Sequence, residues 1–260
     1  MFELRVLLGR DFDPLPYTAG RVLALDPKAG TFEVEIQPGH PLPESNPYFA
    51  RDKKGMIVDP GYPRMKRGVT LVFEHAGWQK LGGRRYRFTA ANGRQVHELA
   101  AGDFYVLDPR ITTGFNVDAS DEVIFYNLTT YAVANEAFNS HYSNWHSILH
   151  CAIRLKPGRF LAANNGGHNH HNARCGPWIE GGVWENTGDD ICHVNGLVMG
   201  VEHQLAPDRV RLPLHNPFDA IGGSIGNAAC RIHERVLAER QAEIGGINGR
   251  WRNPHDILRA

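Results

Sequence analysis

Three short apolar segments in the second half of the chain carry the signal for the fold: Val123–Leu128 (Val-Ile-Phe-Tyr-Asn-Leu), Ser147–Ile153 (Ser-Ile-Leu-His-Cys-Ala-Ile) and Trp178–Trp184 (Trp-Ile-Glu-Gly-Gly-Val-Trp). Within them, Ile124 is followed by Ile148 and Ile179 at intervals of 24 and 31 residues. Short strands that recur at such intervals are typical of a β-solenoid, in which each coil buries its inward side chains on its neighbours. A β-sandwich with irregular loops is the alternative that three imperfect repeats leave open.

The first half of the chain reads as strands separated by turn residues. Thr31–Ile36 alternates apolar and polar side chains with the period of a half-buried strand, between turns that contain glycine and proline. Further strands are expected at Val69–Phe73, Arg85–Phe88 and Phe104–Leu107. The stretch from Pro38 to Pro63 is interpreted as a long surface loop, and only Cys230–Glu243 has the composition of a helix. The sequence therefore predicts an all-β protein.

Composition excludes several classes of partner. The 28 Lys and Arg residues balance 28 Asp and Glu residues, so the charge favours neither a nucleic acid nor a membrane surface. The sequence has no run of about 18 apolar residues and no signal peptide at its start, and the compartment stays unknown. The four cysteines, which form no C-x-x-C pair, are interpreted as buried thiols: Cys151, Cys175, Cys192 and Cys230.

The densest group of reactive side chains lies between Asn164 and His193. It holds four histidines, one arginine, two glutamates and the pair Asp189 and Asp190. Glycosidic bonds are usually hydrolysed by two carboxylates, of which one protonates the leaving oxygen and the other activates water or attacks the sugar. Because neighbours on a strand point to opposite faces, only one of the aspartates is expected to face a groove. The second carboxylate is sought among Glu180, Glu185 and Asp118. A simple turn at Thr187–Asp190 is the alternative.

The histidines of this segment allow two interpretations. In a strand, His168 and His170 would share one face and His171 would take the other. Imidazole suits zinc, copper and iron, so His168, His170 and His193 could hold a divalent metal. The other interpretation needs no cofactor and lets these histidines line a sugar-binding groove.

Two more residue types point toward a sugar. The guanidinium fork of Arg174 suits a carboxylate or vicinal hydroxyls, although an ion pair with a nearby glutamate is equally compatible. Trp178 offers a flat apolar face to a sugar ring, or packs in a core. The predicted substrate-binding residues are His168, His170, Arg174, His193 and Trp178.

Three stretches resemble consecutive rungs of right-handed parallel β-helix carbohydrate enzymes: Gly158–Ala162, Asn172–Glu180 and Glu185–His193. The family they resemble most is that of the β-helix α-1,3-galactosidases, within the pectin-lyase-like group. Asp11–Gly20 is similar to the segment by which such chains leave the helix for an inserted small β-barrel. The resemblance implies a first β-helix segment at residues 1–16, an inserted β-barrel-like subdomain at 17–108 and parallel β-helix rungs at 109–260. Proteins of this family are commonly exported.

The chain departs from the family pattern in ways that bear on catalysis. Where the family has an Asp-Gly pair before the histidine-containing strand, this chain has Gly166 and Gly167, so one expected carboxylate is missing. The His-Gly step after the aspartate pair becomes His193–Gly196. The family pattern also has more rungs before Met1, and an uncapped β-helix end makes a homo-oligomer plausible.

The sequence therefore predicts a glycoside hydrolase that acts on an oligo- or polysaccharide, with Asp189, Asp190 and Glu180 as the acid and base candidates. One alternative is a polysaccharide lyase or a histidine–metal enzyme, in which basic residues or a metal replace the carboxylate missing at Gly166. The other is a glycan-binding or structural β-helix without catalysis. Nucleotide-dependent and serine-hydrolase chemistry have no supporting motif.

Overall fold

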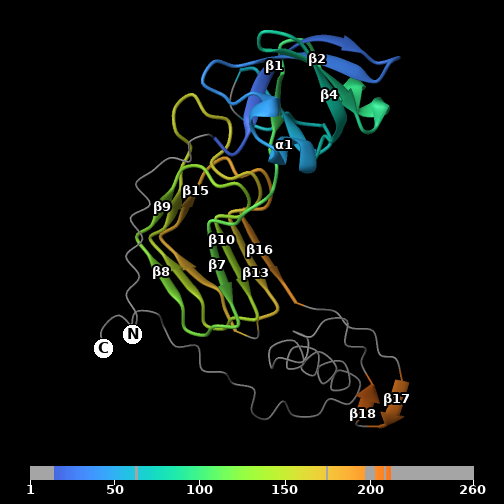
Figure 1. The fold of residues 1–260 in the computed structure, drawn as a ribbon. Helices are drawn as coiled ribbons and strands as arrows, with labels where there is room; N and C mark the ends of the chain where they lie inside the picture. The colour runs from blue at the N-terminus through green and yellow to red at the C-terminus, as the bar shows by residue number, and fades with distance from the viewer. Residues whose placement is uncertain (1–14, 62–63, 174, 197–202, 208, 212–260) are drawn as a thin grey trace.

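The protein is built mainly of β-strands (Figure 1). The structure, a computed structural model, describes residues 15–61, 64–173, 175–196, 203–207 and 209–211. An antiparallel sheet runs from Thr18 to Leu107, and three sheets of parallel strands lie between Phe115 and Asn195. The prediction of an all-β protein is confirmed. Nearly all of the expected first β-helix segment, and the whole of the expected helix Cys230–Glu243, lie outside the described residues. Among the described residues, no helix is long and apolar enough to cross a membrane.

The antiparallel sheet has six strands in the order β3-β6-β1-β2-β5-β4. They are β1 (Thr18–Asp26), β2 (Thr31–Ile36), β3 (Gly55–Val58), β4 (His75–Gly82), β5 (Arg85–Ala90) and β6 (Phe104–Leu107). The sheet curls until its edges meet, because Phe73 N–H donates to the Gly55 carbonyl (2.7 Å) and His75 N–H to the Lys53 carbonyl (3.1 Å). No row of unpaired backbone groups is left where these edges join.

Aromatic rings fill the inside of this curled sheet. Alternate residues of β2 and β5 are buried, as the period-2 pattern of Thr31–Ile36 predicts. Phe32 lies 5.4 Å from Phe73, 5.5 Å from Phe88 and 5.0 Å from Tyr105, measured between ring centroids. These rings and the aliphatic residues around them form the larger of the hydrophobic clusters.

Two expectations for the first half are wrong. Val69–Phe73 is not a strand, and β4 begins only at His75. Its apolar residues reflect burial rather than strand pairing: Val69 packs on the core and Phe73 is fully buried in it. The expected loop from Pro38 to Pro63 contains structure of its own, namely the 3-10 helix η1 (Pro43–Ser45), the helix α1 (Tyr48–Arg51) and the buried strand β3. A further 3-10 helix, η2 (Gly93–Glu98), precedes β6.

The second half forms three parallel sheets that share one set of coils, where a coil is the stretch of chain that adds one strand to each sheet. The first sheet contains β7 (Phe115–Asp118), β10 (Phe138–His141), β13 (His168–His171) and β16 (Cys192–Asn195). The second contains β8 (Ile124–Tyr126), β11 (Ser147–Leu149) and β14 (Trp178–Glu180), and the third β9 (Thr129–Thr130), β12 (Ala152–Ile153) and β15 (Val183–Trp184). A separate antiparallel pair follows, β17 (His203–Ala206) and β18 (Arg209–Arg211).

Equivalent residues of successive coils lie side by side. In the first sheet they are 23, 30 and 24 residues apart, as in the contacts Asn116–Asn139, Ser140–His170 and His171–Asn195. In the second sheet Ile148 pairs with Ile179 as expected, but its partner in β8 is Phe125 and not Ile124. A slip of one residue turns a side chain to the other face of a strand, so it is the ring of Phe125 that packs in the core.

The coils turn at residues in the left-handed backbone conformation. Asn127, His150 and Gly181, with φ of 54°, 52° and 61°, take the same place in three successive coils. Asn127 N–H donates to the Leu149 carbonyl (2.9 Å), and His150 N–H donates to the Glu180 carbonyl (2.8 Å). These turns divide each of the predicted strands at Ser147–Ile153 and Trp178–Trp184 into two shorter ones, one per sheet.

The prediction of buried thiols is confirmed for Cys151 only. Cys151 lies in the core between coils, whereas Cys175 is half-buried and Cys192 is exposed, and all three are free thiols. Cys230 lies outside the described residues.

Replacing Ala119 by glycine should stabilise the protein. Ala119 is exposed and has φ of 46°, a conformation that costs an L-residue about 1–2 kcal/mol and costs glycine little. The expected gain, offset in part by the freedom of glycine in the unfolded chain, is about 0.5–1 kcal/mol in urea unfolding. Ala101→Gly is the control, since exposed Ala101 lacks a positive φ and should lose stability. Equal effects at both positions would contradict the left-handed turn.

Lowering the pH should destabilise the curled sheet through His75. Burial lowers the pKa of this histidine from 6.5 to about 4, so its contribution is present above pH 6.5 and is lost as the pH falls toward 4. At pH 5 the loss is about 2 kcal/mol for this group. Urea unfolding at pH 7.5 and pH 5.0 should therefore show a smaller pH effect in His75→Phe than in the parent protein. An unchanged pH effect would mean that His75 is not buried in this way.

Candidate functional site

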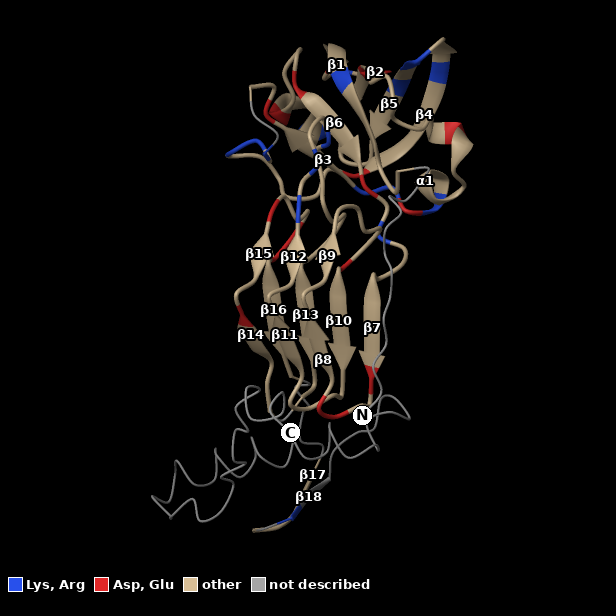
Figure 2. Ribbon diagram, turned by 90° about the vertical axis from the view of Figure 1, so that its left-hand side faces the viewer, with Lys and Arg blue, Asp and Glu red and all other residues tan. Residues whose placement is uncertain are grey.

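The first parallel sheet presents polar side chains on its outer face. Phe115 of β7 and Phe138 of β10 point inward, and their rings stack at 5.3 Å between centroids. Along each strand, the residues that alternate with the inward ones point outward. One outward row consists of Asn116, Asn139, Asn169 and His193, and the other of Asp118, His141, His171 and Asn195. The strands themselves carry few charges, and charged residues gather at their ends (Figure 2).

Two carboxylates flank a glycine at the start of this sheet. Glu136, Gly166 and Asp190 take the same place in successive coils, two residues before β10, β13 and β16. Backbone hydrogen bonds from Ala137 N–H to the Gly166 carbonyl (3.3 Å) and from Gly167 N–H to the Asp190 carbonyl (3.0 Å) fix this alignment. Since neighbouring strands lie about 4.8 Å apart, the backbones of Glu136 and Asp190 are separated by about 9–10 Å.

Gly166 keeps the space between these carboxylates open. A Cβ atom there would lie 3.9 Å from Cγ of Glu136, 3.4 Å from Oδ1 of Asn169 and 3.0 Å from the Asp190 carbonyl oxygen. Any side chain at this position would therefore enter the gap between Glu136 and Asp190. The substitution that removes an expected carboxylate also creates room for another group.

Glu136 is held in place by two asparagines. Its Oε1 atom accepts hydrogen bonds from Nδ2 of Asn165 (2.6 Å) and Nδ2 of Asn169 (2.8 Å), and the residue is 8% exposed. The sequence prediction missed Glu136. Glu136 lies two residues before a strand, as Asp190 does. A sequence alignment of the coils that paired Phe138 with His168 would have shown this equivalence.

The side chains of Asp189 and Asp190 have different surroundings. Asp189 Oδ2 forms an ion pair with Nη1 of Arg110 at 2.7 Å, and the same guanidinium nitrogen donates to Oδ1 of Asn165 at 2.6 Å. Asp190 is exposed, and its N–H donates to Oδ1 of Asp189 at 3.0 Å. The arginine thus ties Asp189 to the asparagine that contacts Glu136, while Asp190 faces solvent.

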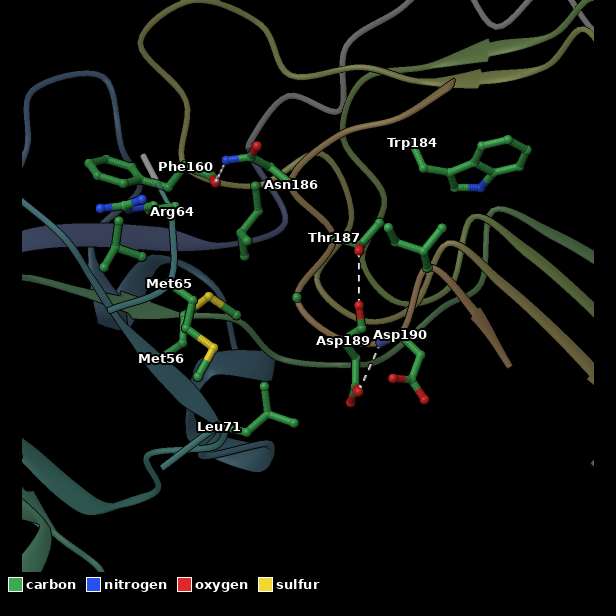
Figure 3. Close-up of a pocket in the computed structure, with 14 residues that line it drawn as sticks. Met56, Arg64, Met65, Leu71, Phe160, Trp184, Asn186, Thr187, Asp189 and Asp190 are labelled. Atoms are coloured by element: carbon green, nitrogen blue, oxygen red, sulfur yellow. Dashed lines mark hydrogen bonds between the residues drawn. The ribbon is translucent and has the colours of Figure 1, made fainter. Parts of the chain in front are cut away.

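A cavity of about 470 Å³ adjoins the aspartate pair (Figure 3). One wall comes from β3 and the loop after it, and the other from the third coil, so the cavity lies between the curled sheet and the parallel sheets. Asp189, Asp190 and Thr187 supply polar groups. The apolar part of the lining includes Met56, Met65, Leu71, Phe160, Trp184 and Ile191.

The structure separates the predicted carboxylates. Asp189 and Asp190 line the cavity, but Glu180 lies on β14 in the second sheet, where it accepts a hydrogen bond from Nε1 of Trp178 at 3.1 Å. Glu185 pairs with Arg154 at 3.1 Å. Asp118 ends β7, so it lies at the opposite end of the first sheet from Asp190. The proposed role of Glu180 beside the aspartates is therefore corrected, because its strand belongs to another face of the coil.

The predicted sugar contacts of His168 and His170 are also corrected. These residues do share one face of β13, as expected, but it is the inner face, and they are 0% and 1% exposed. His193 points outward next to Asn169, with its ring 5.7 Å from that of His171. Trp178 is exposed on the second sheet, away from the cavity lining. Arg174 lies outside the described residues.

The inner histidines gather with a third one that the sequence prediction did not include. A ligating nitrogen of His146, of His168 and of His170 can be chosen so that all three lie within 4.8 Å of one another. Burial, as the main cause, lowers the pKa of His168 to about 3 and those of His146 and His170 to about 4. All three are therefore neutral at pH 7. His193 cannot join them, since it lies on the other side of the sheet.

Comparison with known proteins does not place the chain in a family. No family model matches it, and no curated protein matches it. What the protein does has to be inferred from its own residues.

Proposed function

We propose that the second half of the chain is a short right-handed parallel β-helix and that the protein is a glycoside hydrolase. The β-helix is supported by three parallel sheets that each take one strand from three successive coils, with β16 added to the first sheet, and equivalent residues are paired in all three. Turns in the left-handed conformation recur at equivalent places in the coils. Such repetition is what a solenoid requires, because each coil buries its inner residues on the next.

The observation that carries the proposed activity is the pair Glu136 and Asp190 across Gly166. Inverting glycosidases hold their carboxyl groups about 6.5–9.5 Å apart, which leaves room for a water molecule beside the sugar. Two strand spacings set the backbones of Glu136 and Asp190 about 9–10 Å apart on one face. One carboxyl group of the pair protonates the leaving oxygen, and the other activates the water.

The surroundings of the pair suit a sugar. The cavity next to Asp190 combines apolar surface from Trp184 and Met56 with polar groups from Thr187 and Asp189. Sugar rings have apolar faces and polar edges, so they need both kinds of contact. The outward side chains of Asn169 and His193, which are half-buried and adjacent in the sheet, extend the polar surface.

Positioning of the pair depends on the network around Arg110. The guanidinium group joins Asp189 to Asn165, and Asn165 donates in turn to Glu136. Glu136 and Asp189 are thereby linked through Arg110 and Asn165, and Asp190 joins this network through its backbone N–H, which donates to Oδ1 of Asp189 (3.0 Å). Asp189 acts in this proposal as a positioning residue, since its carboxylate is committed to the ion pair with Arg110.

A screen of glycans for new reducing ends and for unsaturated products tests this function. New reducing ends without unsaturated products support the hydrolase. Unsaturated uronides would indicate a lyase instead, and binding without any turnover across the panel would indicate a glycan-binding protein.

Glu136→Gln and Asp190→Asn should each lower kcat by at least about 100-fold, because each removes one partner of the acid–base pair. Glu185→Gln is the matched control, since Glu185 pairs with Arg154 and does not line the cavity. Its activity should stay within about twofold of the parent protein. Loss of activity in the control, or full activity in either of the first two variants, contradicts the assignment.

The separation of Glu136 and Asp190 also predicts the stereochemistry. If the two carboxyl groups keep roughly the spacing of their backbones, NMR of the first-formed product should show inverted anomeric configuration, because a retaining mechanism needs carboxyl groups about 5–5.5 Å apart. Retention would show that a different pair of carboxylates acts on the sugar.

A further inference from the structure

The inner face of the parallel sheets contains a triangle of histidines that the proposed hydrolase does not use. The ring centroids of His146, His168 and His170 lie 5.6, 5.8 and 5.7 Å apart in pairs. His168 and His170 come from β13 in one coil, and His146 comes from the preceding coil, just before β11. The three rings are 0%, 0% and 1% exposed, and they face one another across the core.

Polar atoms in this triangle lack the partners that burial normally demands. Among the described residues, both ring nitrogens of His146, both of His168 and Nε2 of His170 have no hydrogen-bond partner. A neutral imidazole has one N–H donor and one acceptor nitrogen, and buried polar groups are almost always paired. One nitrogen from each of the three rings lies within 4.8 Å of the others, so the unpaired nitrogens are gathered closely enough to share one ligand.

We propose that His146, His168 and His170 bind one divalent transition-metal ion, with Zn²⁺ the preferred ion, and that the ion cross-links two successive coils from inside. Three imidazole nitrogens are a known ligand set for zinc, with Zn–N distances of about 2.0–2.1 Å. In tetrahedral geometry such ligands lie about 3.4 Å apart. The nitrogens lie within 4.8 Å of one another, and small rotations of the rings would bring them to that spacing.

The chemistry of the three residues favours this class of ion. Neutral imidazole is the form of histidine that binds a metal, and all three rings offer such a nitrogen. In the described part of the chain no carboxylate belongs to the cluster, which disfavours Ca²⁺ and Mg²⁺, since both prefer oxygen ligands. Imidazole nitrogens suit zinc, copper and nickel.

Ser140 orients one of the ligands. Its Oγ atom is hydrogen-bonded to Nδ1 of His170, which leaves Nε2 of that ring as the nitrogen without a partner. Metal-bound histidines usually donate their other N–H to a nearby oxygen, and this contact fixes both the tautomer and the ring angle. Ser140 belongs to the coil before that of His170, and the two residues are paired neighbours in the first sheet.

The site is expected to be structural. Phe125 packs on His146 at 5.2 Å between ring centroids, and the cavity near Asp190 includes none of the three histidines in its lining. An ion held here has no route to a sugar on the outer face. It acts by holding two successive coils together, since His146 belongs to one coil and His168 and His170 to the next.

The test begins with untagged protein expressed with added zinc and analysed by elemental mass spectrometry. The parent protein should hold about one zinc per chain after gel filtration, and removal of the ion by a chelator should lower the midpoint of thermal unfolding by several degrees. Substitution with Co²⁺ should produce visible absorption bands typical of nitrogen ligands in a tetrahedral site. Less than 0.1 equivalent of metal, with no response of the unfolding midpoint to added Zn²⁺ or Co²⁺, would overturn the proposal.

Variants separate the inner histidines from those on the outer face. His146→Phe and His168→Phe keep an aromatic ring in the core but remove the ligand, so metal content should fall at least tenfold. His171→Phe is the matched control, because His171 lies on the outer face and bonds to Oδ1 of Asn195 at 2.6 Å. Metal retained in the first two variants and lost in the third would place binding on the surface and overturn the proposal. Because the parent protein is titrated directly, the test does not depend on the folding of any variant.

Discussion

Backbone hydrogen bonding between successive coils is the constraint on which the second half of this protein depends. The parallel ladders fix each residue beside its equivalent one coil away, for example Phe138 between Phe115 and His168. Every inner and outer position is therefore repeated along the stack, and a residue acquires its surroundings from chain about two dozen or more positions distant. The carboxylates of the outer face and the histidines of the inner face are both products of this one alignment.

The two faces of the first sheet differ in whether their polar side chains are hydrogen-bonded. On the outer face, Nδ2 of Asn169 donates a hydrogen bond to Oε1 of Glu136, which is 8% exposed. On the inner face, the ring nitrogens of His168 find no such partners among the described residues. Polar residues are therefore hydrogen-bonded on the outer face and partly unpaired on the inner face, although the two kinds of position differ by a single step along a strand. The curled antiparallel sheet adds the remaining wall of the cavity through Met56 and Met65.

Several features were predictable from local sequence because they depend on local periodicity. The alternation in Thr31–Ile36 gave the strand with its correct bounds, and alternation also put His168 and His170 on one face. Periodicity shows which residues share a face but not which face is buried. The sequence therefore could not exclude that both histidines line a groove, although the structure buries them. The run Val69–Phe73 failed as a strand prediction because Val69 and Phe73 pack on the core without joining a ladder, while Leu71 is 44% exposed. The domain division stays a prediction.

The sequence by itself determined that the protein is built of β-strands, indicated that short strands recur at intervals of 24 and 31 residues, and placed Asp189 and Asp190 in the densest group of polar side chains. These properties follow from residue types and spacings that act within one strand or turn. Only the tertiary structure decided that Glu136 stands opposite Asp190 and that His146 joins His168 and His170. The physical reason is that coils of unequal length must be aligned by hydrogen bonding before distant residues meet, and a one-residue error in that alignment exchanges inside for outside.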